Sequence, residues 1–347
     1  MNDTHSSEPA FILGLPRSGT TLLSYLLNTH PQVSVPPEPW LLLALEALGE
    51  VSPPNPADSV YLGQAFREFT AGCDLATAKR AFALDLYRQH LARSGKRVLI
   101  DKTPRYWLKL EQIRTTFPDA RYIWLRRNPF AVLASMKTSW GFNLVRQLAG
   151  GGDHLHVFDL ALGSRRLLEF AAHPPRHLLS VSYEDLVDDP VGETGRIFAF
   201  LGVAPFTIER RIDAGKTAAY AGSTLGDKRL LQSAAVNNSG TDAWRTNLVA
   251  EERNMLFDLL GPEAISDWGY ADVAAELGRG RDQARQQQAT RDLLGLVEGV
   301  FQARQMEMRR LAGPEHFDPA TALAVRMAYR YPRQVLDALG LSGTKRS

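Results

Sequence analysis

The sequence predicts an α/β fold in which a central parallel β-sheet is flanked by helices, with a helical extension at the C-terminus. Four short apolar segments have the length and composition of buried strands. They cover residues 10–13, 97–100, 121–125 and 177–181. Stretches with helical periodicity separate them, and this alternation favours a parallel sheet with helices on both faces. In such sheets, ligands bind beyond the carboxyl ends of the strands.

The first strand leads into residues 14–21, which read Gly-Leu-Pro-Arg-Ser-Gly-Thr-Thr. Gly14 and Gly19 have the spacing of a nucleotide phosphate-binding loop, in which a lysine follows the second glycine. Thr20 stands in the place of that lysine, which disfavours a nucleoside triphosphate, but N–H groups at a helix start still favour an anion. Arg17 can form a fork with oxygens of a phosphate or sulfate. We therefore expect a P-loop-like sheet whose ligand has one phosphate-like group at this position.

Three further motifs follow the other predicted strands. Residues 122–129 read Tyr-Ile-Trp-Leu-Arg-Arg-Asn-Pro and precede Ser135, residues 101–104 read Asp-Lys-Thr-Pro, and residues 182–186 read Ser-Tyr-Glu-Asp-Leu. With the loop, these motifs resemble the sulfotransferases that use 3′-phosphoadenosine 5′-phosphosulfate, in their bacterial and tyrosylprotein-sulfotransferase branch. Because all four follow strands, we expect them to meet at one edge of the sheet.

The resemblance implies a set of residues that bind this sulfate donor. They are Arg17, Ser18, Gly19, Thr20 and Thr21 for the 5′-phosphosulfate, Arg127 and Ser135 for the 3′-phosphate, and Tyr183 for the base or the 3′ end. In the family, a strand ends in the arginine and the serine follows eight residues later, which selects Arg127 over Arg126. A later family segment resembles residues 226–245 and adds Lys228 and Ser239, although the proline after Asp227 is absent. For Thr20 and Thr21 the alternative role is simple capping of the helix.

The same resemblance implies three catalytic residues, Glu38, Lys102 and Arg17. Lys102 would support the sulfonate or the bridging oxygen, and its alternative role is a surface salt bridge. Glu38 lies between two prolines in Pro36-Pro37-Glu38-Pro39, where relatives have a glutamate proposed as the base, and its alternative is a plain turn before a helix. His30 competes with Glu38 for this role, since cytosolic relatives use a histidine. Asp101 either orients Lys102 or caps a helix that begins near Tyr106.

Composition excludes several classes of protein. A net charge of +2 is no signature of nucleic-acid binding, and the single cysteine, Cys73, allows no internal disulfide. The longest apolar segment is far shorter than the roughly 20 residues of a membrane span. No secretion signal is visible, so we expect a cytoplasmic protein. No Cys/His cluster has zinc spacing, and we expect that no metal is required because cationic side chains can cover the sulfonate.

The chain is expected to contain a sulfotransferase domain over residues 8–275 and a helical extension over residues 276–347. Helical periodicity predicts helices at 60–70, 75–92 and 155–172, then at 293–311 and 320–339. Residues 221–246 have little periodicity and are expected to form a loop. The C-terminal helices are a candidate surface for packing on the core or for homo-oligomer formation.

Two other functions compete with sulfuryl transfer. A P-loop kinase requires the missing lysine and an aspartate that holds magnesium, for which only Asp101 is suitably placed. A non-catalytic protein that binds 3′-phosphoadenosine 5′-phosphate would keep Arg17, Arg127 and Ser135 and lose Glu38 and Lys102. The acceptor is a small-molecule, glycan, lipid or peptide hydroxyl that the sequence does not identify, because one scaffold hosts many acceptors.

Overall fold

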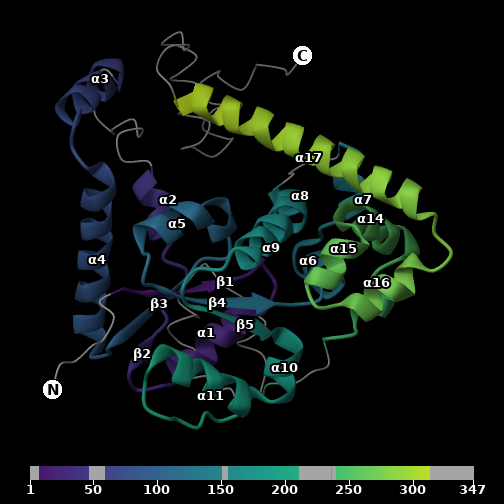
Figure 1. Ribbon diagram of the computed structural model, residues 1–347, viewed down its shortest axis with the longest axis horizontal. Coiled ribbons are helices and arrows are strands. Elements are labelled where there is room, and N and C mark those ends of the chain that lie inside the picture. The colour runs from purple at the N-terminus through teal and green to yellow at the C-terminus, as the bar shows by residue number, and fades with distance from the viewer. Residues whose placement is uncertain (1–7, 47–58, 151–154, 211–235, 237–239, 313–347) are drawn as a thin grey trace, which may run out of the picture. The chain divides into compact units, whose positions relative to one another are not determined.

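The computed structural model describes residues 8–46, 59–150, 155–210, 236 and 240–312 (Figure 1). The chain divides into two compact units, Met1–Leu45 with Asp74–Phe301, and Glu46–Cys73 with Gln302–Ser347. The first unit contains the sheet. The described helical residues of the second unit are α3 (Ser59–Phe69), the last residue of α2 (Leu41–Glu46) and the last turns of α17 (Gln283–Ala312).

The sheet of the first unit has five parallel strands in the order β2-β3-β1-β4-β5. Their bounds are β1 Ala10–Leu13, β2 Val33–Ser34, β3 Val98–Lys102, β4 Arg121–Arg126 and β5 Leu178–Ser182. The register sets Ile12 beside Lys102 and Leu13 beside Trp124. Arg126 and Ser182 are also partners, so the carboxyl ends of four strands lie together at one edge.

Helices cover both faces of this sheet (Figure 1). Around it are α1 Thr20–Asn28, α4 Leu75–Ser94, α5 Leu110–Thr116, α6 Pro129–Trp140, α7 Leu144–Leu148, α8 Leu155–Phe158, α9 Ser164–Ala172, α10 Tyr183–Asp188 and α11 Pro190–Leu201. Alternate strand residues enter different cores, since successive side chains point to opposite faces. Ile12 and Ile123 belong to the core beneath α1 and α11, whereas Phe11 and Tyr122 belong to the core beneath α5 and α9.

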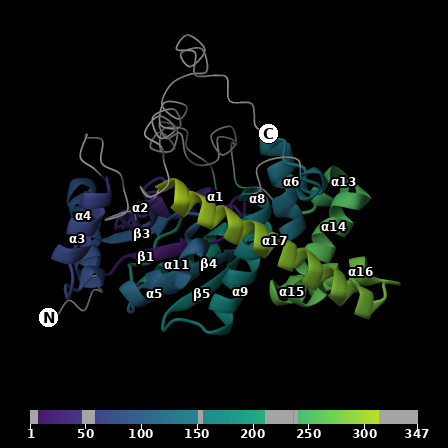
Figure 2. The same cartoon turned by 90° about the horizontal axis from the view of Figure 1, so that it is seen from above.

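A smaller helical group packs beside α6 (Figure 2). It consists of α13 Trp244–Asn247, α14 Ala250–Leu260, α15 Pro262–Asp267 and α16 Ala271–Gly278. The buried ring of Trp244 lies 5.2 Å from that of Phe130 on α6. Trp268, which follows α15, packs edge-on against Trp124 of β4 at 5.3 Å. These aromatic contacts fix the group against the end of the sheet that holds the predicted motifs.

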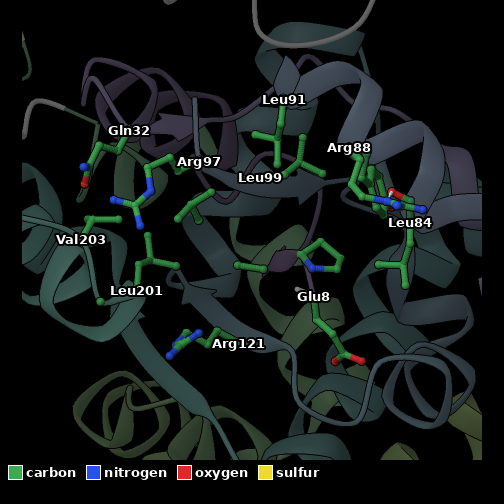
Figure 3. A pocket seen from close by; sticks show the side chains of 15 residues that line it. Glu8, Gln32, Leu84, Arg88, Leu91, Arg97, Leu99, Arg121, Leu201 and Val203 are labelled. Atoms are coloured by element: carbon green, nitrogen blue, oxygen red, sulfur yellow. Dashed lines mark hydrogen bonds between the residues drawn. The ribbon is translucent and has the colours of Figure 1, made fainter. Parts of the chain in front are cut away.

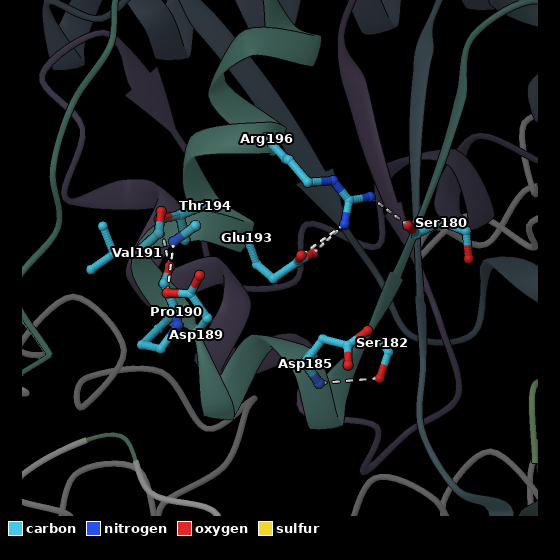
Figure 4. A network of polar contacts seen from close by, with 10 residues as sticks. Ser180, Ser182, Asp185, Asp189, Pro190, Val191, Glu193, Thr194 and Arg196 are labelled. Atoms are coloured by element: carbon cyan, nitrogen blue, oxygen red, sulfur yellow. Dashed lines mark hydrogen bonds and ion pairs between the residues drawn. The ribbon is translucent and has the colours of Figure 1, made fainter.

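Polar contacts fasten α11 to the edge strand β5. The Arg196 guanidinium pairs with Glu193 one turn earlier at 2.7 Å and donates to the Ser180 carbonyl of β5 at 3.2 Å (Figure 4). In the same close-up, the Thr194 hydroxyl donates to the Pro190 carbonyl at 2.7 Å within α11. None of these three contacts involves a residue of the predicted motifs, and we assign them a structural role.

The predicted fold class, a parallel sheet flanked by helices, is confirmed, with some corrections of detail. Strand β2 was missed because two residues are too few for a hydropathy pattern. The predicted strands at 97–100 and 177–181 begin and end one or two residues later. The helix predicted at 155–172 contains a π-helical segment at Asp159–Gly163, and the helix expected near Tyr106 is a 3₁₀ turn, Tyr106–Leu108.

Helices at 60–70, 75–92 and 293–311 are present as α3, α4 and part of α17. The helix at 320–339 and most of the loop at 221–246 lie outside the described residues. The division at residue 275 stays a prediction. Within the described part of the chain, none of the helices combines the length and apolar character needed to cross a membrane.

Candidate active site

The loop between β1 and α1 has the backbone geometry of an anion site. Gly19 is the N-cap of α1 with a left-handed φ of 91°, and this glycine offers no side chain to cap the N–H groups of the first turn. Thr20 and Thr21 are buried in that turn and do not act as the cap. The fully buried Ser18 hydroxyl also has no hydrogen-bond partner among the described residues. Such unpaired donors favour a bound anion.

Tyr183 connects this loop to the second phosphate motif. A Cβ on Gly19 would lie 2.3 Å from the Tyr183 ring, so only glycine allows the ring to pack there. The Arg127 guanidinium lies over the same ring, 4.1 Å from its centre. Tyr183 therefore packs against both the loop and Arg127, and the two predicted phosphate motifs lie close together.

Arg127 is 8% exposed and is held by backbone carbonyls. Its two terminal nitrogens donate to the Arg17 carbonyl at 2.9 Å and to the Gly240 carbonyl at 3.3 Å. Its Nε is buried and has no partner among the described residues. A buried cation with a donor to spare is suited to a phosphate oxygen.

Arg17 turns towards α6. It has a left-handed φ of 70°. Its guanidinium donates to Ser135 at 3.1 Å and to Ser139 at 3.0 Å, and it lies 5.3 Å from the centre of the Trp140 ring. The structure thus brings Arg17, Ser135 and Arg127 into one group, in which the Arg17 side chain extends from the loop to α6.

Glu38 and Lys102 form a buried ion pair. Glu38 Oε1 lies 2.8 Å from Lys102 Nζ, and the two side chains are 10% and 1% exposed. Burial lowers the pKa of Lys102 below its usual value, while the charges of Glu38 and Asp101 oppose this shift. The surface salt bridge that was the alternative for Lys102 is wrong, because Lys102 is almost fully buried. The register of β3 with β1 places Lys102 beside the strand that leads into the loop.

Asp101 belongs to a network of hydroxyl groups. Its carboxylate accepts bonds from Tyr87 at 2.6 Å, Tyr106 at 2.8 Å and Thr103 at 3.2 Å. Complete burial raises the pKa of Asp101 to about 6, although these hydrogen bonds and Lys102 act to lower it. The Tyr106 helix has no side-chain cap, so the capping role expected for Asp101 is wrong. The hydrogen bonds point to a structural anchor at the end of β3.

His30 lies at the opposite end of α1 from the loop. Its Nδ1 accepts the Gln32 N–H at 2.9 Å, which assigns the proton to Nε2, and Nε2 donates to the Ala204 carbonyl at 2.9 Å. The ring is 1% exposed and packs on Phe198 and Phe206. Because α1 has nine residues, His30 is roughly 13 Å along the helix from the loop. Both ring nitrogens have structural roles.

Two further predicted residues, Lys228 and Ser239, lie outside the described residues. From the same segment, Trp244 is buried in the core, and Arg245 pairs with Glu276 at 2.6 Å. Arg245 also lies 4.4 Å from the centre of the Trp244 ring. In this arrangement its charge is already matched by a carboxylate.

Two cavities lie apart from the phosphate loop. One, of about 550 Å³, is lined by Ala10, Val98 and Arg121, the first residues of β1, β3 and β4 (Figure 3). It therefore lies at the amino ends of the strands, opposite the motifs. A second cavity, of about 400 Å³, adjoins Asn128. It is lined by five carboxylates and one arginine, namely Glu184, Asp185, Asp188, Asp242, Asp272 and Arg245. This acidic lining is unsuited to a phosphate.

Ser139 and Thr103 were missed as site residues by sequence reasoning. Ser139 lies four residues after Ser135 on α6, so helical periodicity places both on one face, and this signal was sufficient to find it. Thr103 lies inside a recognised motif, but its contact to Trp40 is formed across 63 residues of sequence. No group of three or more His, Cys, Asp or Glu residues placed to hold a metal occurs in the described ranges.

A parallel sheet with a lysine-free glycine loop, two neighbouring arginines and a buried acid–lysine pair is an arrangement suited to an anionic ligand. A family model described as "Sulfotransferase family" matches residues 9–207, more than half of the chain. The chain belongs to the sulfotransferase family, as the sequence motifs predict.

Several named proteins are similar to this chain. Nodulation protein NoeE of Sinorhizobium fredii is 41% identical over 278 residues, covering 75% of this chain and 65% of that protein. Human heparan sulfate glucosamine 3-O-sulfotransferase 6 is 29% identical and covers 56% of this chain. This chain spans 65% and 52% of the lengths of these two relatives. Among solved structures, the sulfotransferase domain of the Synechococcus PCC 7002 olefin synthase is 24% identical, with a TM-score of 0.49, over 81% of this chain and 98% of that domain.

Proposed function

We propose that this protein transfers a sulfuryl group from 3′-phosphoadenosine 5′-phosphosulfate to a hydroxyl acceptor. The observation that carries the proposal is the buried Glu38–Lys102 pair at 2.8 Å, whose lysine ends β3 beside the strand that leads into the phosphate loop. A carboxylate and an ammonium in this position supply the proton acceptor and the positive charge that sulfuryl transfer needs.

The loop residues and the arginines fit this donor. The helix N-terminus with the unpaired Ser18 hydroxyl is assigned to the 5′-phosphosulfate, and Thr20 and Thr21 line the same turn. Arg127, with its spare Nε donor, is assigned to the 3′-phosphate, and Tyr183, which packs against both the loop and Arg127, is assigned to the base or the 3′ end. Arg17 and Ser135, which contact each other, connect them.

In the proposed reaction, the acceptor oxygen attacks the sulfur in line with the bond that breaks. Glu38 takes the hydroxyl proton as the new S–O bond forms. The bond between sulfur and the 5′-phosphate oxygen breaks, and 3′-phosphoadenosine 5′-phosphate leaves with the electron pair. Lys102 stabilises the charge on the leaving oxygen, and Arg17 orients the sulfonate. Positioning and charge stabilisation supply most of the acceleration in such transfers.

The missing loop lysine and the burial of Asp101 disfavour the competing kinase function. Thr20 replaces the phosphate-binding lysine, and Asp101, the candidate magnesium ligand, is fully buried with three hydroxyl donors on its carboxylate. The non-catalytic alternative predicts loss of Glu38 or Lys102, yet both are present and paired.

Trp140 is the aromatic candidate for acceptor contact. It is 44% exposed beside Arg17, whereas the nearby aromatic residues Trp107 and Phe142 are buried in the core. The relatives act on different acceptors by name, including heparan sulfate glucosamine and protein tyrosine. The acceptor panel should therefore contain a glycan, a phenol and a tyrosine peptide.

The test measures transfer of labelled sulfate from the donor to N-acetylglucosamine oligomers, 4-nitrophenol and an acidic tyrosine peptide. We expect transfer to at least one acceptor class, retained in excess EDTA because cationic side chains neutralise the sulfonate. Transfer that EDTA abolishes and magnesium restores would favour the kinase-like chemistry. A binding assay should also show a preference for 3′-phosphoadenosine 5′-phosphate over ATP with magnesium.

A further inference from the structure

The backbone of Trp40 is held in an unusual conformation beside the proposed base. Its φ is 53°, in the left-handed region that bulky residues rarely adopt. Among the described non-glycine residues, only Trp40 and Arg17 have a positive φ, and both border the site. Such conformations persist where the surrounding structure holds them, and they concentrate at functional sites.

Two hydroxyl groups hold the segment that contains Trp40. The Trp40 N–H donates to Thr103 Oγ1 at 3.2 Å, and the Leu42 N–H donates to Tyr106 Oη at 3.5 Å. A hydroxyl has one proton, and both of these hydroxyls donate theirs to Asp101. The Asp101 carboxylate therefore turns the lone pairs of both oxygens towards the N–H groups of residues 40–42.

The Trp40 side chain in turn contacts the Glu38 carboxylate. The indole Nε1–H donates to Glu38 Oε2 at 3.3 Å, while Oε1 pairs with Lys102. Each carboxylate oxygen thus has one donor. Lys102 and Thr103 are consecutive residues at the end of β3, so the same turn supplies the partner of Oε1 and the support for Trp40.

We propose that Thr103, oriented by Asp101, is a positioning residue: its hydroxyl holds the Trp40 backbone so that the indole N–H fixes the Glu38 carboxylate. This inference rests on the proposed function, in which Glu38 takes the acceptor proton. Thr103 does not touch the reacting atoms and acts through Trp40. The hydroxyl is the essential group, because Val has the shape of Thr without the acceptor that Trp40 needs.

The first test detects the effect of Thr103 on Trp40 by NMR and needs no activity measurement. The indole ¹⁵N–¹H resonance of Trp40 is assigned by its loss in Trp40→Phe. We expect Thr103→Val to shift this resonance and Thr103→Ser to restore it. Thr194→Val is the matched control, since Thr194 is a fully buried threonine whose hydroxyl bonds only within α11. An unmoved Trp40 resonance in Thr103→Val would overturn the proposed positioning.

The second test reads the consequence for transfer. We expect Thr103→Val to lower single-turnover transfer on the order of 10–10²-fold, as misplaced catalytic groups do, with unchanged affinity for 3′-phosphoadenosine 5′-phosphate. Thr103→Ser should restore the rate, and Thr194→Val should keep it. Because Thr103 acts on Glu38 only through Trp40, the two substitutions should not be additive. The double variant Thr103→Val with Trp40→Phe should have a transfer rate only slightly below that of the slower single variant. Additive losses, or a normal rate in Thr103→Val, would overturn the inference.

The experiments distinguish a failure of the proposed function from a failure of the positioning role of Thr103. A wild-type protein that transfers no sulfate to any acceptor overturns the proposed function. An active wild type with a normal Thr103→Val rate overturns only the positioning role. If Thr103→Val does not fold, Trp40→Phe tests the same path from its other end, because it removes only the indole donor, and a normal rate in that variant overturns the inference.

Discussion

Glu38 Oε1 lies 2.8 Å from Lys102 Nζ, although the two residues are 64 positions apart in the chain, and both side chains are nearly excluded from water. A buried ion pair is weak evidence for stability, because the cost of removing both charges from water offsets their attraction. Its position beside the phosphate loop gives a functional reason for it. The proposed reaction uses the two groups separately, one for the proton and one for the leaving oxygen.

Glu38→Gln should keep the affinity for the donor nucleotide and lower single-turnover transfer by about 10²–10⁴-fold, since the amide cannot accept the proton but still offers Lys102 an oxygen. His30→Asn is the comparison variant. Because both His30 ring nitrogens are bonded to the backbone, we expect it to lower the melting temperature and leave the transfer rate nearly unchanged. A near-normal rate in Glu38→Gln with a slow His30→Asn would assign the base to His30.

Asp101 should make stability depend on pH. Burial raises its pKa from 3.8 in the unfolded chain to about 6 in the folded protein. Between these values the folded state holds a proton that the unfolded state has released, so the contribution of Asp101 to the free energy of unfolding falls as pH rises from about 4 to 6. In Asp101→Asn this fall should disappear.

The measurement is urea unfolding of both proteins at pH 4, 5, 6 and 7. The difference in unfolding free energy, wild type minus variant, should decrease up to about pH 6 and stay level above it. A difference that is constant over this range, or that grows with pH, would contradict the raised pKa. Tyr87, Tyr106, Thr103 and Lys102 face the carboxylate and are unchanged in the variant.

The fold class and the proximity of the motif residues could be predicted from the sequence because their signals are local. Each motif follows a strand, and parallel strands bring their carboxyl ends to one edge, so Arg17 and Arg127 had to be near each other. The choice of Arg127 over Arg126 followed from spacing. In the structure Arg126 instead bonds the Trp268 carbonyl at 2.8 Å and lies outside the group formed by Arg17, Ser135 and Arg127.

The remaining features depend on contacts between distant segments. Nothing in the spacing of Glu38 and Lys102 predicts that they pair, and nothing near Trp40 predicts its left-handed backbone, whose N–H contacts Thr103 from a distant part of the chain. The burial of His30 is similar: its partner Ala204 comes 174 residues later. The site roles themselves stay predictions until the variants are measured.

Gly19→Ala should abolish tight donor binding. The left-handed φ of 91° alone costs a Cβ residue roughly 1–2 kcal/mol, and the added Cβ would also lie 2.3 Å from the Tyr183 ring. Gly95→Ala is the matched control, since Gly95 has a φ of 65° and open space around the added Cβ. We expect Gly95→Ala to lose stability only, as measured by thermal unfolding and nucleotide calorimetry. Equal nucleotide affinity in both variants would contradict the close packing of Tyr183 on the loop.

Arg127→Ala should selectively weaken recognition of the 3′-phosphate. Arg127 is nearly buried between the Tyr183 ring and two backbone carbonyls, and its Nε has no partner among the described residues. A charged hydrogen bond is worth roughly 1.5–3 kcal/mol, so the affinity for 3′-phosphoadenosine 5′-phosphate should fall by about 10–150-fold. The affinity for adenosine 5′-phosphate, which lacks the 3′-phosphate, should change much less.

The control for this prediction is the neighbouring arginine. Arg126→Ala removes a cation of the same size, but Arg126 bonds the Trp268 carbonyl and lies over the Trp124 ring, so its loss should lower stability and spare nucleotide affinity. Calorimetry on both variants with both nucleotides separates the two roles. If Arg127→Ala binds the two nucleotides as the wild type does, or if Arg126→Ala alone loses the preference for the 3′-phosphate, the assignment of Arg127 is wrong. The eight-residue spacing to Ser135 would then have selected the wrong arginine.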